Sequence, residues 1–166
     1  RLPHASRSQA AREWAQDAIG AEGNRLIAGA CVLVVGLGAI GGAVAHRMTL
    51  LGARVTGLRR RAAGETHGEW TVAPAGRLHE LLPAADVVVV AAPHTRETRG
   101  LIGRPELALM ARDAILVNVS RGPLIDEPAL VEALRARTIG GAALDVFVDE
   151  PLPPDSAFWT LPNVLI

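Results

Sequence analysis

The sequence predicts an α/β fold in which helices cover both faces of a mostly parallel β-sheet. Three observations support this prediction. Short apolar runs, such as VVVVAA at 87–92, are typical of strands that are buried on both faces. Helix-like stretches alternate with these runs, and this alternation is typical of right-handed β-α-β units. The core must be aliphatic, because the 166 residues are 49% hydrophobic but include only two Phe and no Tyr.

Three helices are predicted from start signals or spacing. We expect a first helix over 6–19, with Ser6 or Ser8 as its cap and with Trp14 and Ile19 on its apolar side, because polar caps precede helical runs. Residues 39–52 place apolar side chains three or four positions apart, which is the spacing of one helix face. A helix over 126–137 begins with an aspartate as its N-cap and a proline in the first turn. Further helices are expected at 77–86 and 104–112, and strands at 31–36, 54–58, 70–73, 87–92, 114–120, 142–147 and 163–166.

Composition and charge narrow the function further. The chain shows no repeat, low-complexity stretch or linker, so we expect residues 1–166 to form a single domain. Its 17 basic and 17 acidic residues cancel, which argues against nucleic acid or a membrane surface as partner. No apolar run reaches the roughly 18 residues of a membrane span, and we expect no signal peptide before the fold. The single Cys31 opens an apolar strand, where we expect a core residue, and a reducing, cytoplasmic location fits it.

A glycine-rich turn follows the first strand. Gly36, Gly38 and Gly41 form G-x-G-x-x-G between an apolar strand and an amphipathic helix, which is the context that gives this motif meaning. The first glycine permits a tight turn, the second lets the backbone approach a pyrophosphate, and the third lets helix and strand pack closely. The anion would lie on the amide groups of Ala39 and Ile40 at the helix N-terminus. The sequence therefore predicts a Rossmann-type, three-layer dinucleotide-binding domain.

The second strand ends in arginines instead of the acid that usually binds the ribose. No Asp or Glu occurs between Gly36 and Gly64, and Arg59 and Arg60 stand where the acid is expected. An acid would repel a 2′-phosphate, whereas an arginine pairs with one. This favours NADP over NAD as the cofactor. The alternative is a solvated basic turn in a chain whose basic residues are all arginine.

Four motifs in order resemble the cofactor-binding domain of the D-isomer-specific 2-hydroxyacid dehydrogenases. They are ADVVVVAAPHTRETRGLIG, VNVSRGPLIDEPALVEAL, GAALDVFVDEPLP and LPNVLI, and the resemblance covers about residues 8–166. It implies that Arg121 of NVSRG binds and polarises a 2-oxo acid, and that Glu150 of DVFVDEP is the catalytic carboxylate. Asp145 is implied to contact the nicotinamide carboxamide. The other implied cofactor contacts are Pro93, Thr98, Val119 and Ser120.

The chemistry of these residue types agrees with that role. A fixed guanidinium can pair with both the carboxylate of a 2-oxo acid and the alkoxide that forms from its carbonyl. The hydride belongs to the nicotinamide, and a histidine backed by a carboxylate such as Glu150 can deliver the proton. The family's histidine follows the last strand, so we expect it beyond Ile166. His94 is the alternative proton carrier, although a loop position near the cofactor or substrate is the simpler interpretation.

We therefore expect an oxidoreductase that interconverts a small 2-oxo acid and a D-2-hydroxy acid with NADP(H), with glyoxylate or hydroxypyruvate as candidate substrates. The chain is expected to be an excised cofactor domain whose substrate domain is absent, so it should bind cofactor but scarcely turn over. The resemblance also implies a homodimer joined through this domain. A dinucleotide-sensing corepressor and an adenosylhomocysteine hydrolase-like protein are the alternatives. The histidines show no metal-ligand spacing, so no metal site is predicted.

Overall fold

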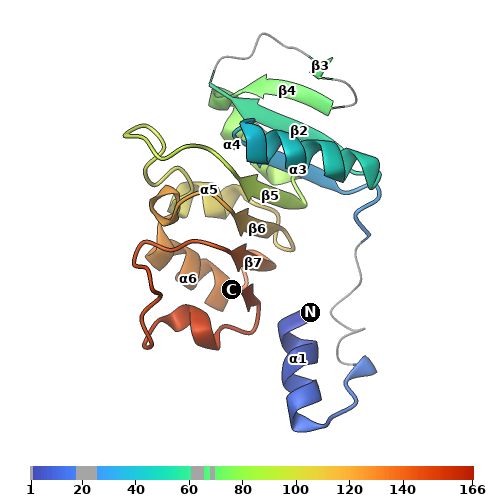
Figure 1. Cartoon of the computed structure of the whole chain (residues 1–166), viewed down its shortest axis with the longest axis vertical. Helices are drawn as coiled ribbons and strands as arrows, with labels where there is room; N and C mark the ends of the chain where they lie inside the picture. Colours follow the sequence, from blue (N-terminus) through green and yellow to red (C-terminus); the bar gives the residue numbers. More distant parts are fainter. Residues whose placement is uncertain (1, 18–25, 61–65, 68–69) are drawn as a thin grey trace.

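The computed structural model describes residues 2–17, 26–60, 66–67 and 70–166, and it has an eight-stranded sheet at its centre (Figure 1). The strand order is β3-β4-β2-β1-β5-β6-β7-β8, and every neighbouring pair is parallel except β3 and β4. This confirms the predicted α/β fold. The strands are β1 (Cys31–Val35), β2 (Arg54–Arg59), β3 (Thr66–His67), β4 (Trp70–Pro74), β5 (Val87–Val90), β6 (Ile115–Asn118), β7 (Gly141–Leu144) and β8 (Val164–Leu165).

Helices cover both faces of the sheet. Successive residues of β1 pack into two separate apolar clusters, because side chains alternate between the faces of a strand. Val34 belongs to the cluster under α3, and Leu33 belongs to the larger cluster under α4, α5 and α6. Figure 1 shows α3 in front of the sheet and α5 and α6 behind it. The α-helices are α1 (Leu2–Ala11), α3 (Ala39–Leu50), α4 (Leu78–Leu81), α5 (Arg104–Leu109) and α6 (Glu127–Arg135).

The chain reverses its direction across the sheet beside β1. It runs from β1 outward through β2 to β4, and then returns to place β5 on the other side of β1. From β5 it continues outward through β6, β7 and β8. Because these seven strands are parallel, the loops at their carboxyl ends all emerge at one edge. In open α/β sheets, ligands bind in the crevice at such a switch point.

The first helix differs from the prediction. It spans Leu2–Ala11 instead of 6–19, and Arg12 follows it in the left-handed region with a φ of 60°. Ser8, one of the two predicted caps, lies inside the helix and is 7% exposed. Trp14, which we expected on its apolar side, lies outside the helix and is 91% exposed. Without an apolar anchor in this part of the segment, packing does not extend the helix, and propensity alone rarely does. Ile19, the other predicted apolar contact, lies outside the described residues.

Other boundaries moved by a few residues, mostly at the carboxyl edge. Strand pairing ends at Val90, Asn118 and Leu144, which is two to three residues earlier than predicted at each strand. The released residues form the loops of the site described below. The helix expected at 77–86, with Pro83 ending it, is present as the α-helix α4, which ends at Leu81 before this proline because proline cannot continue an α-helix. The 3₁₀ turns η1 (Ala75–Arg77) and η2 (Leu82–Ala84) flank it. The two-residue strand β3 was not predicted. The remaining 3₁₀ turns are η3 (Gly122–Leu124) and η4 (Ala157–Thr160).

Cys31, which we expected in the core, and Trp159 are not buried. Cys31 is only partly buried, and its Sγ accepts a hydrogen bond from Nη2 of Arg54 at 3.1 Å. Trp159 is 53% exposed and donates through Nε1 to the carbonyl of Pro153, whereas its neighbour Phe158 is buried. In the part of the chain that the structure describes, no helix has the length and apolar character needed to cross a membrane.

Candidate active site at the carboxyl edge

Two glycines of the glycine-rich turn are required by packing. Gly36 has a φ of +101°, and a Cβ atom there would lie 2.5 Å from the Cα of Ala92. A Cβ on Gly41 would lie 1.8 Å from the carbonyl oxygen of Gly36. Real side chains do not tolerate such distances, so these two positions hold β1, its turn and α3 together.

Gly38 differs from these two, because apart from its own atoms and those of its chain neighbours nothing lies within 4 Å of the position that a Cβ would take. It is the N-cap of α3, and neither a capping side chain nor an acidic residue occupies the first helical turn. Ala39 and Ile40, which follow it, are exposed. The start of this helix therefore presents backbone amides to open space, which suits an anion such as a pyrophosphate. The residues present fit a dinucleotide.

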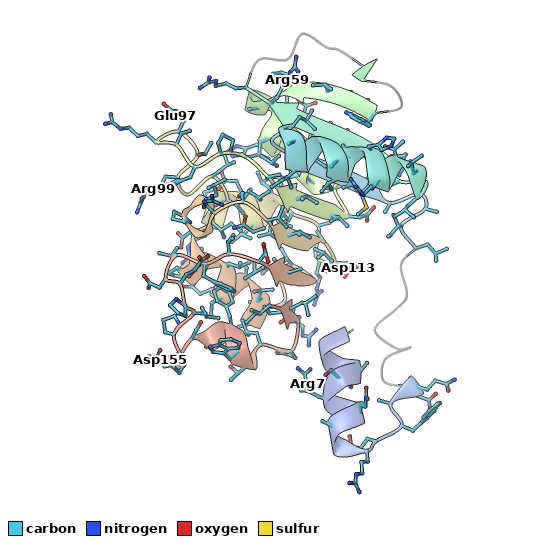
Figure 2. All side chains as sticks on the ribbon, in the orientation of Figure 1. Arg7, Arg59, Glu97, Arg99, Asp113 and Asp155 are labelled. Atoms are coloured by element: carbon cyan, nitrogen blue, oxygen red, sulfur yellow. The ribbon has the colours of Figure 1, made fainter. Side chains whose placement is uncertain are left out.

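Arg59 and Arg60 lie where β2 ends, on the strand next to the glycine-rich turn. Arg59 is partly buried and Arg60 is exposed. Arg60 also reaches the loop after β5 electrostatically. The pKa of Glu97 in that loop is lowered by the hydroxyl of Thr95 and by its own backbone amide, and the positive charge of Arg60 contributes as well. Figure 2 shows Glu97 and Arg99 at the end toward which the strand arrows point, with Asp113 at the opposite end.

The loop after β5 is closed by hydrogen bonds from one threonine. Thr98 donates through Oγ1 to the carbonyl of Pro93 at 2.7 Å, and the same oxygen accepts from the amide of Thr95 at 2.8 Å. The structure thus joins the two residues of this loop that the resemblance implied. His94 lies exposed between them in sequence.

The turn after β6 is organised by Asn118, a residue that the sequence did not single out. Asn118 is 1% exposed, and its Oδ1 accepts from both the amide and the hydroxyl of Ser120 at 3.1 and 2.8 Å. Its Nδ2 donates to the carbonyl of Arg121 at 3.1 Å. Buried polar groups are costly unless they are paired, and here one side chain holds the turn through three hydrogen bonds. An asparagine at the end of an apolar strand was the available sequence signal.

The turn after β6 that carries Arg121 (residues 119–122, the arginine turn) and the loop after β7 that carries Glu150 (residues 145–150, the glutamate loop) are in direct contact. A Cβ on Gly122 would lie 1.9 Å from the carbonyl carbon of Phe147 and 2.3 Å from the amide nitrogen of Val148. Glu150 folds back onto this loop, where its Oε1 accepts from the amide of Phe147 at 2.9 Å. The segments that carry Arg121 and Glu150 therefore touch, and both side chains are exposed.

The other predicted residues lie along the same edge. Asp145 is exposed at the end of β7, and its amide donates to the carbonyl of Asn118 at 3.0 Å. Val119 is partly buried and Ser120 is buried, directly before Arg121. A pocket of about 520 Å³ between α1 and β8 contains none of these residues. Among the described residues, no three His, Cys, Asp or Glu side chains could hold a metal together.

A parallel sheet with a glycine-rich turn at its switch point, and with Arg121 and Glu150 on loops at the same edge, has the architecture of a dinucleotide-binding domain. The chain belongs to the D-isomer specific 2-hydroxyacid dehydrogenase family, whose NAD binding domain model matches residues 1–166. This confirms the resemblance that the motifs indicated.

Similar proteins include glyoxylate/hydroxypyruvate reductase B of Pectobacterium carotovorum, which is 44% identical over 133 residues. That match covers 80% of this chain and 41% of the relative. A D-isomer specific 2-hydroxyacid dehydrogenase from Xanthobacter autotrophicus, solved with NADPH and MES, is 37% identical with a TM-score of 0.86. There the match covers 99% of this chain and 65% of the solved one.

An NADPH-dependent glyoxylate/hydroxypyruvate reductase from Sinorhizobium meliloti, solved with NADP and sulfate, is 28% identical with a TM-score of 0.86. It is matched over 99% of this chain and 51% of that chain. The present chain spans between 25% and 41% of the length of curated relatives that it matches.

Proposed function

We propose that this chain is the cofactor-binding domain of an oxidoreductase that transfers a hydride between NADP(H) and a small 2-oxo acid. The observation that carries the proposal is the contact between the Gly122 turn and the 147–148 peptide, because it places the segments of Arg121 and Glu150 side by side. A substrate domain would complete the enzyme. Relatives named as glyoxylate/hydroxypyruvate reductases support glyoxylate and hydroxypyruvate as the candidate substrates.

In this proposal Arg121 binds the substrate. Its guanidinium is exposed at the carboxyl edge and donates through Nη1 to the carbonyl of Ser120 at 2.7 Å, which fixes one end of its planar fork. The remaining N–H groups can pair with the carboxylate of a 2-oxo acid and with the carbonyl oxygen that gains negative charge. A preorganised cation stabilises that charge without needing to move.

Glu150 serves proton delivery in this proposal. Oε1 is held by the Phe147 amide, so the carboxylate has a defined orientation. Its second oxygen, Oε2, would accept a hydrogen bond from the acid that protonates the new alkoxide, and the negative charge favours that acid's protonated form. A bound nicotinamide supplies the hydride.

We propose NADP as the preferred form of the cofactor. Arg59 and Arg60 provide positive charge beside the ribose end of the crevice, and the sequence places no acid there between Gly36 and Gly64. Solved relatives that contain NADPH or NADP support this choice. We also propose that the protein is a homodimer, which a molar-mass measurement in solution would test. We further propose a cytoplasmic location.

The decisive experiment measures the dissociation constants of NADPH and NADH by calorimetry, together with NADPH oxidation by glyoxylate and hydroxypyruvate in the complete enzyme. We expect Arg59→Asp to weaken NADPH binding at least tenfold and NADH binding less than threefold, because only NADPH carries the 2′-phosphate. Arg112→Asp, an exposed change at the opposite edge, is the control and should alter neither constant. Equal losses for both nucleotides would contradict the NADP assignment. A complete enzyme without turnover on any 2-oxo acid would contradict the reaction.

A further inference from the structure

The glutamate loop is held by two carboxylates that come from different parts of the chain. The amide of Phe147 donates to Oε1 of Glu150, as described above. The next amide, that of Val148, donates to Oε1 of Glu127 at 2.7 Å. Glu127 is the first residue of α6, which follows the arginine turn through η3.

Glu127 and Gly122 both contact the peptide group between Phe147 and Val148. The atoms that would lie within 2.3 Å of a Cβ on Gly122 are the carbonyl group of Phe147 and the amide nitrogen of Val148. This peptide therefore rests on the backbone next to Arg121, while its N–H is bound by Glu127. A slide of the loop away from Arg121 would break the hydrogen bond to Glu127.

The surroundings of Glu127 disfavour the charged form of its side chain. Burial raises the pKa of Glu127, the Val148 amide acts in the opposite direction, and the negative charge of Asp149 raises this pKa further. An exposed glutamate in this first helical turn would avoid both the burial and the repulsion by Asp149, and it would still interact favourably with the helix dipole. The partly buried position of Glu127 instead provides a hydrogen bond to the amide of Val148.

We infer that Glu127 is a positioning residue for the reaction, which clamps the 147–150 loop against the arginine turn and so sets the position of Glu150 relative to Arg121. The inference rests on the proposed function. Substrate binding depends on Arg121, whose turn is held separately by Asn118. Losing Glu127 should therefore slow the proton-dependent step more than it weakens substrate or cofactor binding.

The test compares Glu127→Ala and Glu127→Gln with Glu132→Ala, a matched control on the same helix whose carboxylate is exposed and paired with Arg104. Steady-state kinetics use NADPH and glyoxylate with the complete enzyme. In Glu127→Ala we expect kcat to fall at least tenfold, while the KM for glyoxylate stays within threefold and the NADPH Kd within twofold. Glu127→Gln keeps an oxygen acceptor, so its kcat should stay within threefold of wild type.

A second readout is independent of activity. Amide hydrogen exchange, followed by NMR on the 166-residue chain, should become at least tenfold faster at Val148 in Glu127→Ala. Exchange at Leu144 within β7 should remain within twofold, which separates loosening of the loop from unfolding.

Wild-type exchange at Val148, or a wild-type kcat in Glu127→Ala, would overturn the inference. A Glu127→Gln variant as impaired as Glu127→Ala would overturn it too, because the acceptor would then not be what matters. An inactive wild-type enzyme would overturn the proposed function and this role with it. An active wild type with an unaffected Glu127→Ala variant would overturn this inference alone.

Discussion

The glycines of the G-x-G-x-x-G turn look alike in the sequence but do different things in the structure. Gly36 and Gly41 have no room for a side chain, because backbone atoms lie within 2.5 Å and 1.8 Å of the position that a Cβ would take. Gly38 has open space instead, and its φ of −82° is one that alanine adopts readily. A packing role and a binding role can therefore be separated by experiment.

We expect Gly38→Ala to fold with a free energy of unfolding within about 0.5 kcal/mol of wild type, as exposed changes usually do. The added methyl group would stand in the pyrophosphate path, so the NADPH Kd should rise at least tenfold. Gly36→Ala should instead cost more than about 2 kcal/mol, because strain at a positive φ adds to the clash with Ala92. Urea unfolding and calorimetric titration measure both quantities. Normal NADPH binding by Gly38→Ala would contradict the assignment of this glycine to the cofactor.

Single residues could be assigned a role from the sequence only where their neighbours along the chain form a recognisable motif. Gly36, Gly38 and Arg59 could be selected because their neighbours along the chain form a motif. Glu127 could not, because its partner Val148 is 21 positions away and lies on a different element. The role of Asn118 depends on its burial and its hydrogen bonds, which no residue pattern specifies.

At the scale of elements, α5 shows how a short helix is tied to its neighbours. Glu106 accepts from the amide of Gly103, the N-cap residue, through Oε2 at 2.9 Å and so pairs one of the free amides at the helix start. Its Oε1 lies 2.6 Å from Nε2 of His79 on α4. Burial acts to raise the pKa of Glu106, but the Gly103 amide, His79 and its own amide together lower it.

This lowered pKa makes the stability contribution of α5 depend on pH. Because the folded state favours the carboxylate, the contribution is present above the ordinary glutamate pKa and is lost as pH falls through the lowered value. We expect Glu106→Gln to cost about 1 kcal/mol at pH 7, because glutamine keeps an acceptor for the Gly103 amide but lacks the charge that strengthens this bond and the contact with His79, and to cost less at pH 3. Urea unfolding of both proteins across this range checks the expectation. A difference that stays constant from pH 7 to pH 3 would show that the charge of Glu106 does not stabilise the fold.

The elements that were predicted best carry their own start and stop signals. Asp126 caps α6 as expected, since its side chain accepts from the amide of Ala129 at 3.1 Å. β1 ends at Val35 because the chain turns at the next residue, Gly36, with a positive φ. The first helix was misplaced because its boundaries depend on tertiary packing, which residues 6–19 do not reveal in sequence.

At the scale of the whole molecule, the cofactor would contact the loops of several strands that meet only in the folded sheet. A ligand that binds only the folded state stabilises it by RT ln(1 + [L]/Kd), or about 2.7 kcal/mol at a hundredfold excess over Kd. For a chain of this size each kcal/mol raises the Tm by roughly 2–4 °C.

We therefore expect NADPH, at about a hundred times its Kd, to raise the Tm by roughly 5–11 °C. NADH at the same concentration should raise it by clearly less, since it lacks the phosphate that the arginines attract. Scanning calorimetry on the chain measures both shifts, with ATP as a control for non-specific binding of phosphates. Equal shifts for the two dinucleotides would contradict the proposed preference.

The strand order separates two groups of candidate site residues along one edge of the sheet. Arg59 and Arg60 lie at the end of β2, whereas Arg121 and Glu150 follow β6 and β7, with β1 and β5 in between. If these residues have the roles proposed above, altering the two arginines would change the coenzyme preference at one end of this edge while the reacting groups at the other end stay the same. The choice of coenzyme and the substrate chemistry could then evolve, or be redesigned, one at a time.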